Sequence, residues 1–187
     1  MNFITTLEKL ISAFDEVEVR CALIGGFAMA MRGVQRATVD LDFILMLDDL
    51  DKAHRILEKL GYERGFKSEN VSHYFSNDSS LGRIDLLHAF RGPTLSMLDR
   101  ADRLELAPSL HVPVVRIEDI IGLKIQAAVN DRKRSTLDWA DIRLLIEHCA
   151  AMGKQPNWDL IADYLEIFHL ESKLTEMKEW YGTTNQE

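Results

Sequence analysis

The stretch ALIGGFAMAMRGVQRATVDLDFIL, residues 22–45, has two glycines after one apolar run and two aspartates inside the next. Only one residue separates Asp40 from Asp42. Side chains two apart on a strand project from the same face, about 6.6 Å apart along the chain, so we expect these two carboxylates to point together. The opposite face then carries an uninterrupted apolar row that should pack into a core: Val39, Leu41, Phe43 and Leu45.

Two neighbouring carboxylates repel each other, and partial burial makes it still more costly to ionise both. A divalent cation such as Mg²⁺ removes that cost, because it prefers oxygen ligands and leaves positions open for phosphate oxygens. The same spacing also fits an edge strand with one wet face. Asp85 favours the metal interpretation, because it supplies a third carboxylate within the apolar run GRIDLLHAF, residues 82–90, where Ile84 and Leu86 should face the core. If the two strands are neighbours, the three carboxylates converge on a site suited to phosphoryl or nucleotidyl transfer.

Gly25 and Gly26 follow the expected strand CALI, residues 21–24, and precede an Ala- and Met-rich helix expected over residues 27–33. Glycine permits a tight turn, and backbone N–H groups at a helix start can receive phosphate oxygens. The pair belongs neither to the dinucleotide fingerprint G-x-G-x-x-G nor to the P-loop G-x-x-x-x-G-K-[ST], which are both absent.

The order of these motifs resembles the nucleotidyltransferase superfamily, which has the DNA polymerase beta-like fold. The resemblance is carried by IGGFAMAMRG, by the R-x-T-x-D-h-D strand and by the later IDLL, and it covers roughly residues 19–148. The stretch looks most like the AbiEii-type, or minimal nucleotidyltransferase, branch. The implied fold is α+β, with a small mixed β-sheet flanked by helices and a C-terminal helical region.

The resemblance implies an enzyme that moves a nucleoside monophosphate from an NTP to an acceptor hydroxyl, with Mg²⁺ or Mn²⁺ as cofactor. Gly25 and Gly26 would hold the triphosphate, and Asp40 and Asp42 would ligate the metal. Asp85 would share a metal and accept the proton of the attacking hydroxyl.

Further matches to the family are Arg36, Thr38 and Lys124. Arg36 and Thr38 would brace the metal strand, with a phosphate contact as the alternative for Arg36. Lys124 would neutralise triphosphate charge, or else be a surface lysine of an amphipathic helix. Asp138 and Asp141, three residues apart on a helix, share a face and could hold Lys124 or Arg134 in place.

Residues 1–116 mix helix and strand patterns and are expected to form the catalytic core, whereas residues 117–187 read as helical throughout. The terminal amphipathic segment could pack on a second subunit, as in a homodimer, or simply fray. A small helical partner protein is the other expected partner. Cys21 and Cys149 are far apart in apolar surroundings, so we expect two reduced thiols. The chain has neither an apolar run near 20 residues nor a signal-peptide pattern, which predicts a cytoplasmic protein without a membrane partner.

The formal net charge of -8 argues against broad binding to nucleic acid, although Arg132, Lys133 and Arg134 form a local basic segment. A protein side chain or a small molecule is therefore favoured over RNA as the acceptor. Two alternatives stay open. One is a non-catalytic nucleotide- or protein-binding relative, such as one half of a toxin-antitoxin pair; the other is a metal-dependent phosphohydrolase.

Overall fold

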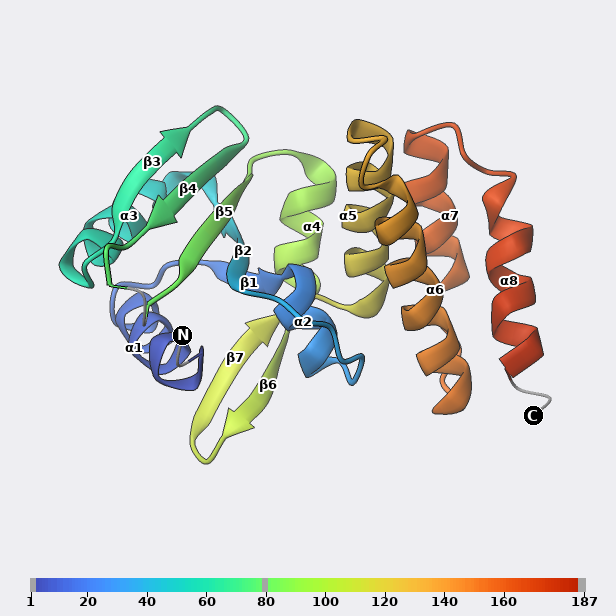
Figure 1. Cartoon of the computed structure of the whole chain (residues 1–187), viewed down its shortest axis with the longest axis horizontal. Coiled ribbons are helices and arrows are strands. Elements are labelled where there is room, and N and C mark those ends of the chain that lie inside the picture. Colours follow the sequence, from blue (N-terminus) through green and yellow to red (C-terminus); the bar gives the residue numbers. More distant parts are fainter. Residues whose placement is uncertain (1–2, 79–80, 185–187) are drawn as a thin grey trace. The chain divides into compact units, whose positions relative to one another are not determined.

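The fold is that of a computed structural model, which describes residues 3–78 and 81–184 (Figure 1). The chain forms two compact units. The first comprises the chain up to Met31 together with Gln35–Arg116, and the second comprises Arg32–Val34 together with the chain from Ile117. Each unit has its own core and is described separately.

The first unit is built on a seven-stranded sheet with the strand order β3-β4-β5-β2-β1-β7-β6. Its strands are β1 (Cys21–Ile24), β2 (Asp40–Met46), β3 (Glu63–Lys67), β4 (Val71–Phe75), β5 (Arg83–Ala89), β6 (Asp102–Ala107) and β7 (Leu110–Val114). Strand β2 runs parallel to β5 and β1 runs parallel to β7, whereas the remaining pairs are antiparallel. The predicted mixed sheet is thus confirmed.

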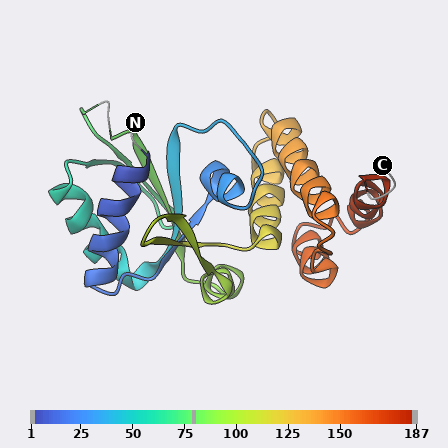
Figure 2. The same ribbon diagram turned by 90° about the horizontal axis from the view of Figure 1, so that it is seen from below.

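The helices of this unit flank the sheet, as predicted. They are α1 (Phe3–Glu16), α2 (Gly25–Met31), the 3-10 turn η1 (Leu47–Asp49), α3 (Leu50–Lys59) and α4 (Gly92–Arg100). Seen from below, α1 and α3 lie on one side of the sheet and α2 lies on the other (Figure 2). Phe14 of α1 meets Phe43 of β2 edge to face, with ring centroids 6.3 Å apart. The main core of the unit therefore lies between the sheet and these two helices.

The apolar row predicted for β2 is correct from Leu41 onward, because Leu41, Phe43 and Leu45 are fully buried. Ile44, on the face of Asp40 and Asp42, is fully buried as well, so the alternation of buried and partly exposed residues ends after Asp42. The prediction for Val39 is wrong. Its side chain is 75% exposed, since β2 begins only at Asp40 and Val39 belongs to the preceding loop.

Three elements were not expected from the sequence: β3, α4 and β6. Every residue of β3 is exposed, so this edge strand has no apolar alternation to signal it. Helix α4 buries only Met97, and its short sequence contains both Gly and Pro. Strand β6 is the other edge of the sheet and contains no fully buried residue. In addition, α2 starts at Gly25 itself, two residues earlier than expected.

The second unit is helical where the structure describes it, apart from the connecting turns. Its helices are α5 (Ile117–Asn130), α6 (Ser135–Ala151), α7 (Trp158–Ile167) and α8 (Lys173–Thr184). Fully buried aliphatic side chains of α5, α6 and α7 form its core: Ile121, Ile125, Ile142, Leu145, Ile146, Ile161 and Leu165. Both cysteines are free thiols, as expected. Within the described ranges, no helix has both the length and the apolar character needed to cross a membrane.

His88 is a buried titratable group of the sheet core, at 2% exposure on the same face as Ile84 and Leu86. Its Nδ1 lies 2.8 Å from the Glu69 carbonyl oxygen and its Nε2 lies 2.9 Å from Ser72 Oγ. Because a carbonyl only accepts, Nδ1–H is the donor, and a neutral ring then accepts at Nε2. Burial lowers the pKa of His88 below its ordinary value of 6.5.

This lowered pKa predicts an acid-sensitive fold. Between the ordinary pKa of 6.5 and the lowered pKa, His88 is protonated in the unfolded chain but not in the folded chain. The free energy of unfolding therefore decreases as the pH is lowered through this window. Urea unfolding of wild type and His88→Gln at about pH 7.5 and about pH 5.5 measures the change in the free energy of unfolding. The wild type should lose more stability on acidification than His88→Gln. The exposed His111→Gln variant should behave as wild type; equal losses in all three proteins would contradict the assignment.

Candidate active site

The parallel register of β2 and β5 brings the predicted carboxylates together. Asp42 lies opposite Asp85, and Asp40 lies opposite Arg83. Ile84 and Leu86 are fully buried, as expected, so Asp85 projects from the opposite face of the sheet. Asp40 and Asp85 keep 26% and 18% of their side chains exposed, which leaves both within reach of a ligand.

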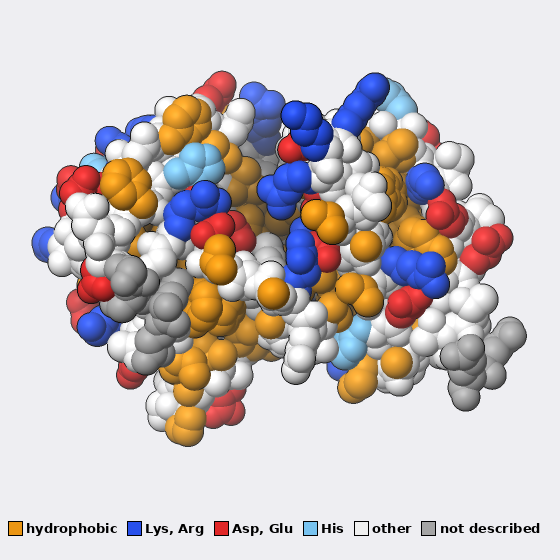
Figure 3. Space-filling model, in the orientation of Figure 1, with side chains coloured by type: hydrophobic (Ala, Val, Ile, Leu, Met, Phe, Trp, Pro, Cys, Tyr) orange, Lys and Arg blue, Asp and Glu red, His pale blue; other side chains and the backbone are white. Residues whose placement is uncertain are grey.

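Arg83 bridges two of these carboxylates. Its Nη2 lies 2.9 Å from Asp40 Oδ2 and also 2.9 Å from Asp85 Oδ2, so these two oxygens are at most twice that distance apart. Figure 3 shows acidic, basic and histidine side chains side by side over β4 and β5. Asp40 and Asp85 therefore share one guanidinium in this structure.

His73 of β4 engages the other oxygen of Asp85. Its Nδ1 lies 2.8 Å from Asp85 Oδ1, and because an ionised carboxylate only accepts, Nδ1–H is the donor. The His73 ring stacks on Phe66, with centroids 5.4 Å apart and planes inclined by 24°. Asp85 is thus held from both sides, by His73 at Oδ1 and by Arg83 at Oδ2.

Sequence reasoning missed both Arg83 and His73. Arg83 could have been found, because it precedes Asp85 by two residues on the same strand and must share its face. His73 could not, because its position depends on the antiparallel pairing of β4 with β5, which sets it opposite Asp85.

The two glycines leave room for the side chains of the aspartate strand and the loop before it. Gly25 has a positive φ of 66°, and a Cβ added there would collide with the Asp42 carboxylate. A Cβ on Gly26 would lie 2.9 Å from Cβ of Thr38. Thr38 in turn donates its hydroxyl to the Asp40 carbonyl, at 3.2 Å, and so supports the start of β2. Small residues at 25 and 26 are therefore a steric requirement of the aspartate strand.

Of the other expected nucleotide-binding residues, Arg36 lies partly exposed in the loop between α2 and β2. Lys124 belongs to α5, in the second unit. Its Nζ lies 2.9 Å from Asp138 Oδ1 and 2.7 Å from Asp141 Oδ2. The lysine side chain is only 12% exposed and the two aspartates 1% and 6%, so this is a buried ion-pair cluster. The two aspartates of α6 hold Lys124, which is the first of the two roles that their spacing predicted.

The donor chemistry of Asp40, Asp42 and Asp85 fits a hard divalent cation, which takes carboxylate oxygens. Over residues 3–78 and 81–184, however, no group of three or more His, Cys, Asp or Glu side chains is already arranged to hold a metal ion. The cation between Asp40 and Asp85 in this structure is the Arg83 guanidinium. A metal could use these carboxylates once that guanidinium moves.

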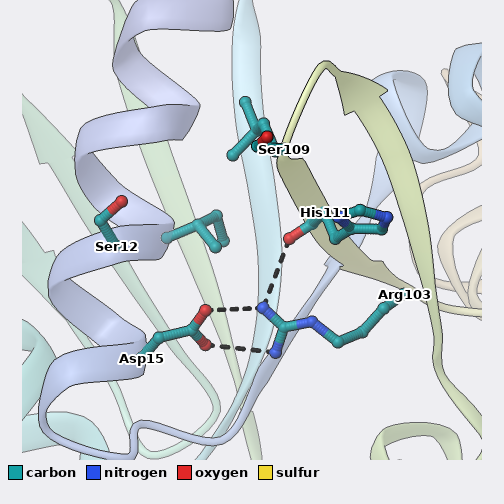
Figure 4. A pocket seen from close by; sticks show the side chains of 7 residues that line it. Ser12, Asp15, Arg103, Ser109 and His111 are labelled. Atoms are coloured by element: carbon teal, nitrogen blue, oxygen red, sulfur yellow. Dashed lines mark hydrogen bonds and ion pairs between the residues drawn. The ribbon is translucent and has the colours of Figure 1, made fainter.

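A hollow of about 340 Å³ lies between α1 and the β6–β7 hairpin and contains none of the predicted site residues (Figure 4). Arg103 spans it and forms two bonds to the Asp15 carboxylate, at 3.2 and 2.6 Å. The same guanidinium donates to the His111 carbonyl oxygen at 3.3 Å. Arg103 is thus committed to structural contacts within the hollow.

Solved structures share this fold. One is ANT(2")-Ia in complex with adenylyl-2"-tobramycin, with a TM-score of 0.65 and 18% identity over 90% of this chain and 99% of that chain. A second is the lincomycin-bound lincosamide antibiotic adenylyltransferase LnuA, with a TM-score of 0.55 and 15% identity over 75% of this chain and 94% of that chain. A third is a putative nucleotidyltransferase from Thermotoga maritima, with a TM-score of 0.57 and 11% identity over 74% of this chain and 92% of that chain. The fold is therefore the nucleotidyltransferase fold.

The family follows from the sequence itself. A family model described as "Uncharacterised nucleotidyltransferase" matches residues 1–175. The chain belongs to this nucleotidyltransferase family, which confirms the predicted superfamily and enzyme class. No curated protein matches the sequence. The narrower AbiEii-type assignment stays a prediction.

The steric role of Gly25 predicts a large cost for a side chain there. Gly25→Ala should lower the free energy of unfolding by about 1–3 kcal/mol, because it combines a left-handed backbone with displacement of the Asp42 carboxylate. Gly92→Ala is the matched control, since nothing lies within 4 Å of its added Cβ. Urea unfolding compares the two variants. Similar stabilities would rule out the close packing of Gly25 on Asp42.

The Lys124 cluster predicts a second stability effect. Lys124→Met should cost about 3–5 kcal/mol, because it leaves two buried carboxylates without their cation. Arg143→Met, which removes an exposed pair with Glu147, should cost about 1 kcal/mol or less. Chemical denaturation measures both changes. Adding Asp138→Asn and Asp141→Asn should recover part of the loss in Lys124→Met, and a loss no larger than that of Arg143→Met would contradict the buried pairing.

Proposed function

We propose that the first unit is the catalytic core of a metal-dependent nucleotidyltransferase that moves a nucleoside monophosphate from an NTP to an acceptor hydroxyl. The observation that carries the proposal is the β2–β5 register, which sets Asp42 opposite Asp85 with Asp40 two residues away on the same face. Three carboxylates on one partly exposed sheet face form a donor set for divalent cations. Membership of a nucleotidyltransferase family agrees with this chemistry.

In the proposed reaction the acceptor oxygen attacks the α-phosphorus of the nucleotide. A new bond forms between these atoms, and the bond from the α-phosphorus to the oxygen bridging the β-phosphate breaks. Pyrophosphate leaves with that electron pair. The hydroxyl proton passes to Asp85, whose carboxylate is oriented by the bond from His73 Nδ1 at 2.8 Å.

Asp40, Asp42 and Asp85 would hold Mg²⁺ or Mn²⁺, which would supply charge neutralisation at the phosphates. Gly25 and Gly26 bring the backbone of α2 close to the nucleotide. Both are steric neighbours of the aspartate strand, because added side chains there would meet Asp42 and Thr38.

The remaining predicted residues take supporting parts. Thr38 fixes the start of β2 through its bond to the Asp40 carbonyl, and Arg36 braces the same loop or meets phosphate. A triphosphate contact by Lys124 stays a prediction, and in that role its ammonium would be shared with Asp138 and Asp141.

For the substrates, we propose ATP as the nucleotide and a small hydroxyl-bearing molecule as the acceptor. The structure of ANT(2")-Ia contains adenylyl-2"-tobramycin, and LnuA is a lincosamide antibiotic adenylyltransferase bound to lincomycin. The net charge of -8 also favours a small or cationic acceptor over RNA. A protein hydroxyl is the competing acceptor.

The test is transfer of label from nucleotide to acceptor. The purified protein is incubated with α-labelled ATP, CTP, GTP or UTP, with Mg²⁺ or Mn²⁺, and with separate small-molecule and protein fractions of a cell extract. Label from ATP should appear on a small molecule. Asp42→Asn should lower the transfer rate at least about 100-fold, whereas Asp48→Asn, an exposed carboxylate of η1, should leave it unchanged.

Other outcomes separate the alternatives. Label on protein would replace the small-molecule acceptor, and free monophosphate alone would indicate a phosphohydrolase. Nucleotide binding without turnover, unchanged in Asp42→Asn, would overturn the enzymatic proposal in favour of a non-catalytic member, as in a toxin-antitoxin pair.

A further inference from the structure

We propose that Arg83 is a built-in counter-cation that competes with the divalent metal for Asp40 and Asp85. This inference rests on the proposed function, because it concerns the same carboxylates. It adds a positioning residue that neither the motif nor the family resemblance assigns.

Arg83 engages one oxygen of each of two carboxylates. Its Nη2 lies 2.9 Å from Oδ2 of Asp40 and 2.9 Å from Oδ2 of Asp85. His73 occupies Oδ1 of Asp85 at 2.8 Å. With Oδ1 shared with His73, a metal that binds Asp85 through Oδ2 meets the oxygen that Arg83 holds. Metal and guanidinium are competitors for the same site.

The sheet itself fixes this arrangement. Arg83 lies directly opposite Asp40 on the neighbouring parallel strand and two residues before Asp85 on its own strand. Both relationships put its side chain on the carboxylate face. The pairing of the two strands therefore places the Arg83 guanidinium beside both carboxylates.

Arg83 is exposed enough to be displaced. Arg83 and Lys124 each bridge two carboxylates, and the burial of the two cations differs. Lys124 is 12% exposed between nearly buried aspartates, whereas Arg83 is 52% exposed. An exposed ion pair contributes only about 0–1 kcal/mol, so a divalent ion can replace it, while a buried bridge is not exchanged at such low cost.

The expected consequence is a metal-free protein whose carboxylates are already partly neutralised and whose apparent metal affinity is lowered. Without Arg83, Asp40 and Asp85 would repel each other at close range. With Arg83 in place, the two strands stay paired with no metal present. A cation that uses both Oδ2 atoms competes with the guanidinium that holds them.

The experiment is a Mn²⁺ titration without nucleotide, in which the electron paramagnetic resonance signal of free Mn²⁺ reports binding. Arg83→Gln and Arg83→Met should each bind Mn²⁺ about three- to thirtyfold more tightly than wild type, since each removes two exposed ion pairs. Arg83→Lys keeps the charge and should stay near wild type. Circular dichroism checks that each variant is folded.

Arg103→Gln is the matched control, because Arg103 is also 52% exposed and is paired with Asp15. Its Mn²⁺ affinity should equal that of wild type. If both neutral Arg83 variants bind Mn²⁺ no more tightly than wild type, the proposed competition is wrong. If Asp42→Asn abolishes Mn²⁺ binding in the same experiment, the proposed metal site is retained. Absence of Mn²⁺ binding in every protein would overturn both the competition and the proposed metal dependence.

Discussion

The parallel pairing of β2 with β5 is the constraint on which the site depends. It sets Asp42 opposite Asp85 and Asp40 opposite Arg83, while Leu41, Phe43, Ile84 and Leu86 are buried on the other face. A slip of one residue in either strand would exchange the two faces, so the hydrophobic core enforces the register. The positions of the carboxylates are thus fixed by the burial of their apolar neighbours, which explains how charged residues persist inside two apolar strands.

The two units neutralise their clustered carboxylates in different ways. In the second unit, Lys124 is buried between Asp138 and Asp141, where it serves the packing of α5 on α6. In the first unit, Asp40 and Asp85 stay partly exposed, and the side chain of Arg83, which bridges them, is half-exposed. The exposed arrangement is the one that can exchange its cation. This difference in burial separates a structural ion pair from a site suited to a ligand.

The sequence predicted the parts of the site that follow from local alternation. Asp40 and Asp42 share a face because they are two residues apart, and Asp85 was placed by the burial of its neighbours. The contact of His73 with Asp85 could not be predicted from the sequence, because it depends on which strands pair. The exposed edge strand β3 was also missed, since strand prediction relies on a buried face and this strand has none. Val39 was misplaced because the sequence gives no sharp signal for where a strand begins.

The central claim is that Asp40, Asp42 and Asp85 form one metal site. The most direct measurement is the anomalous scattering of Mn²⁺ in crystals of the protein grown with Mn²⁺ and a non-hydrolysable ATP analogue. The account predicts an anomalous peak among these carboxylates, with the Arg83 guanidinium displaced from Asp40 and Asp85. Electron density for the nucleotide analogue at another surface, with no peak at the carboxylates and with Arg83 still bridging them, would contradict it.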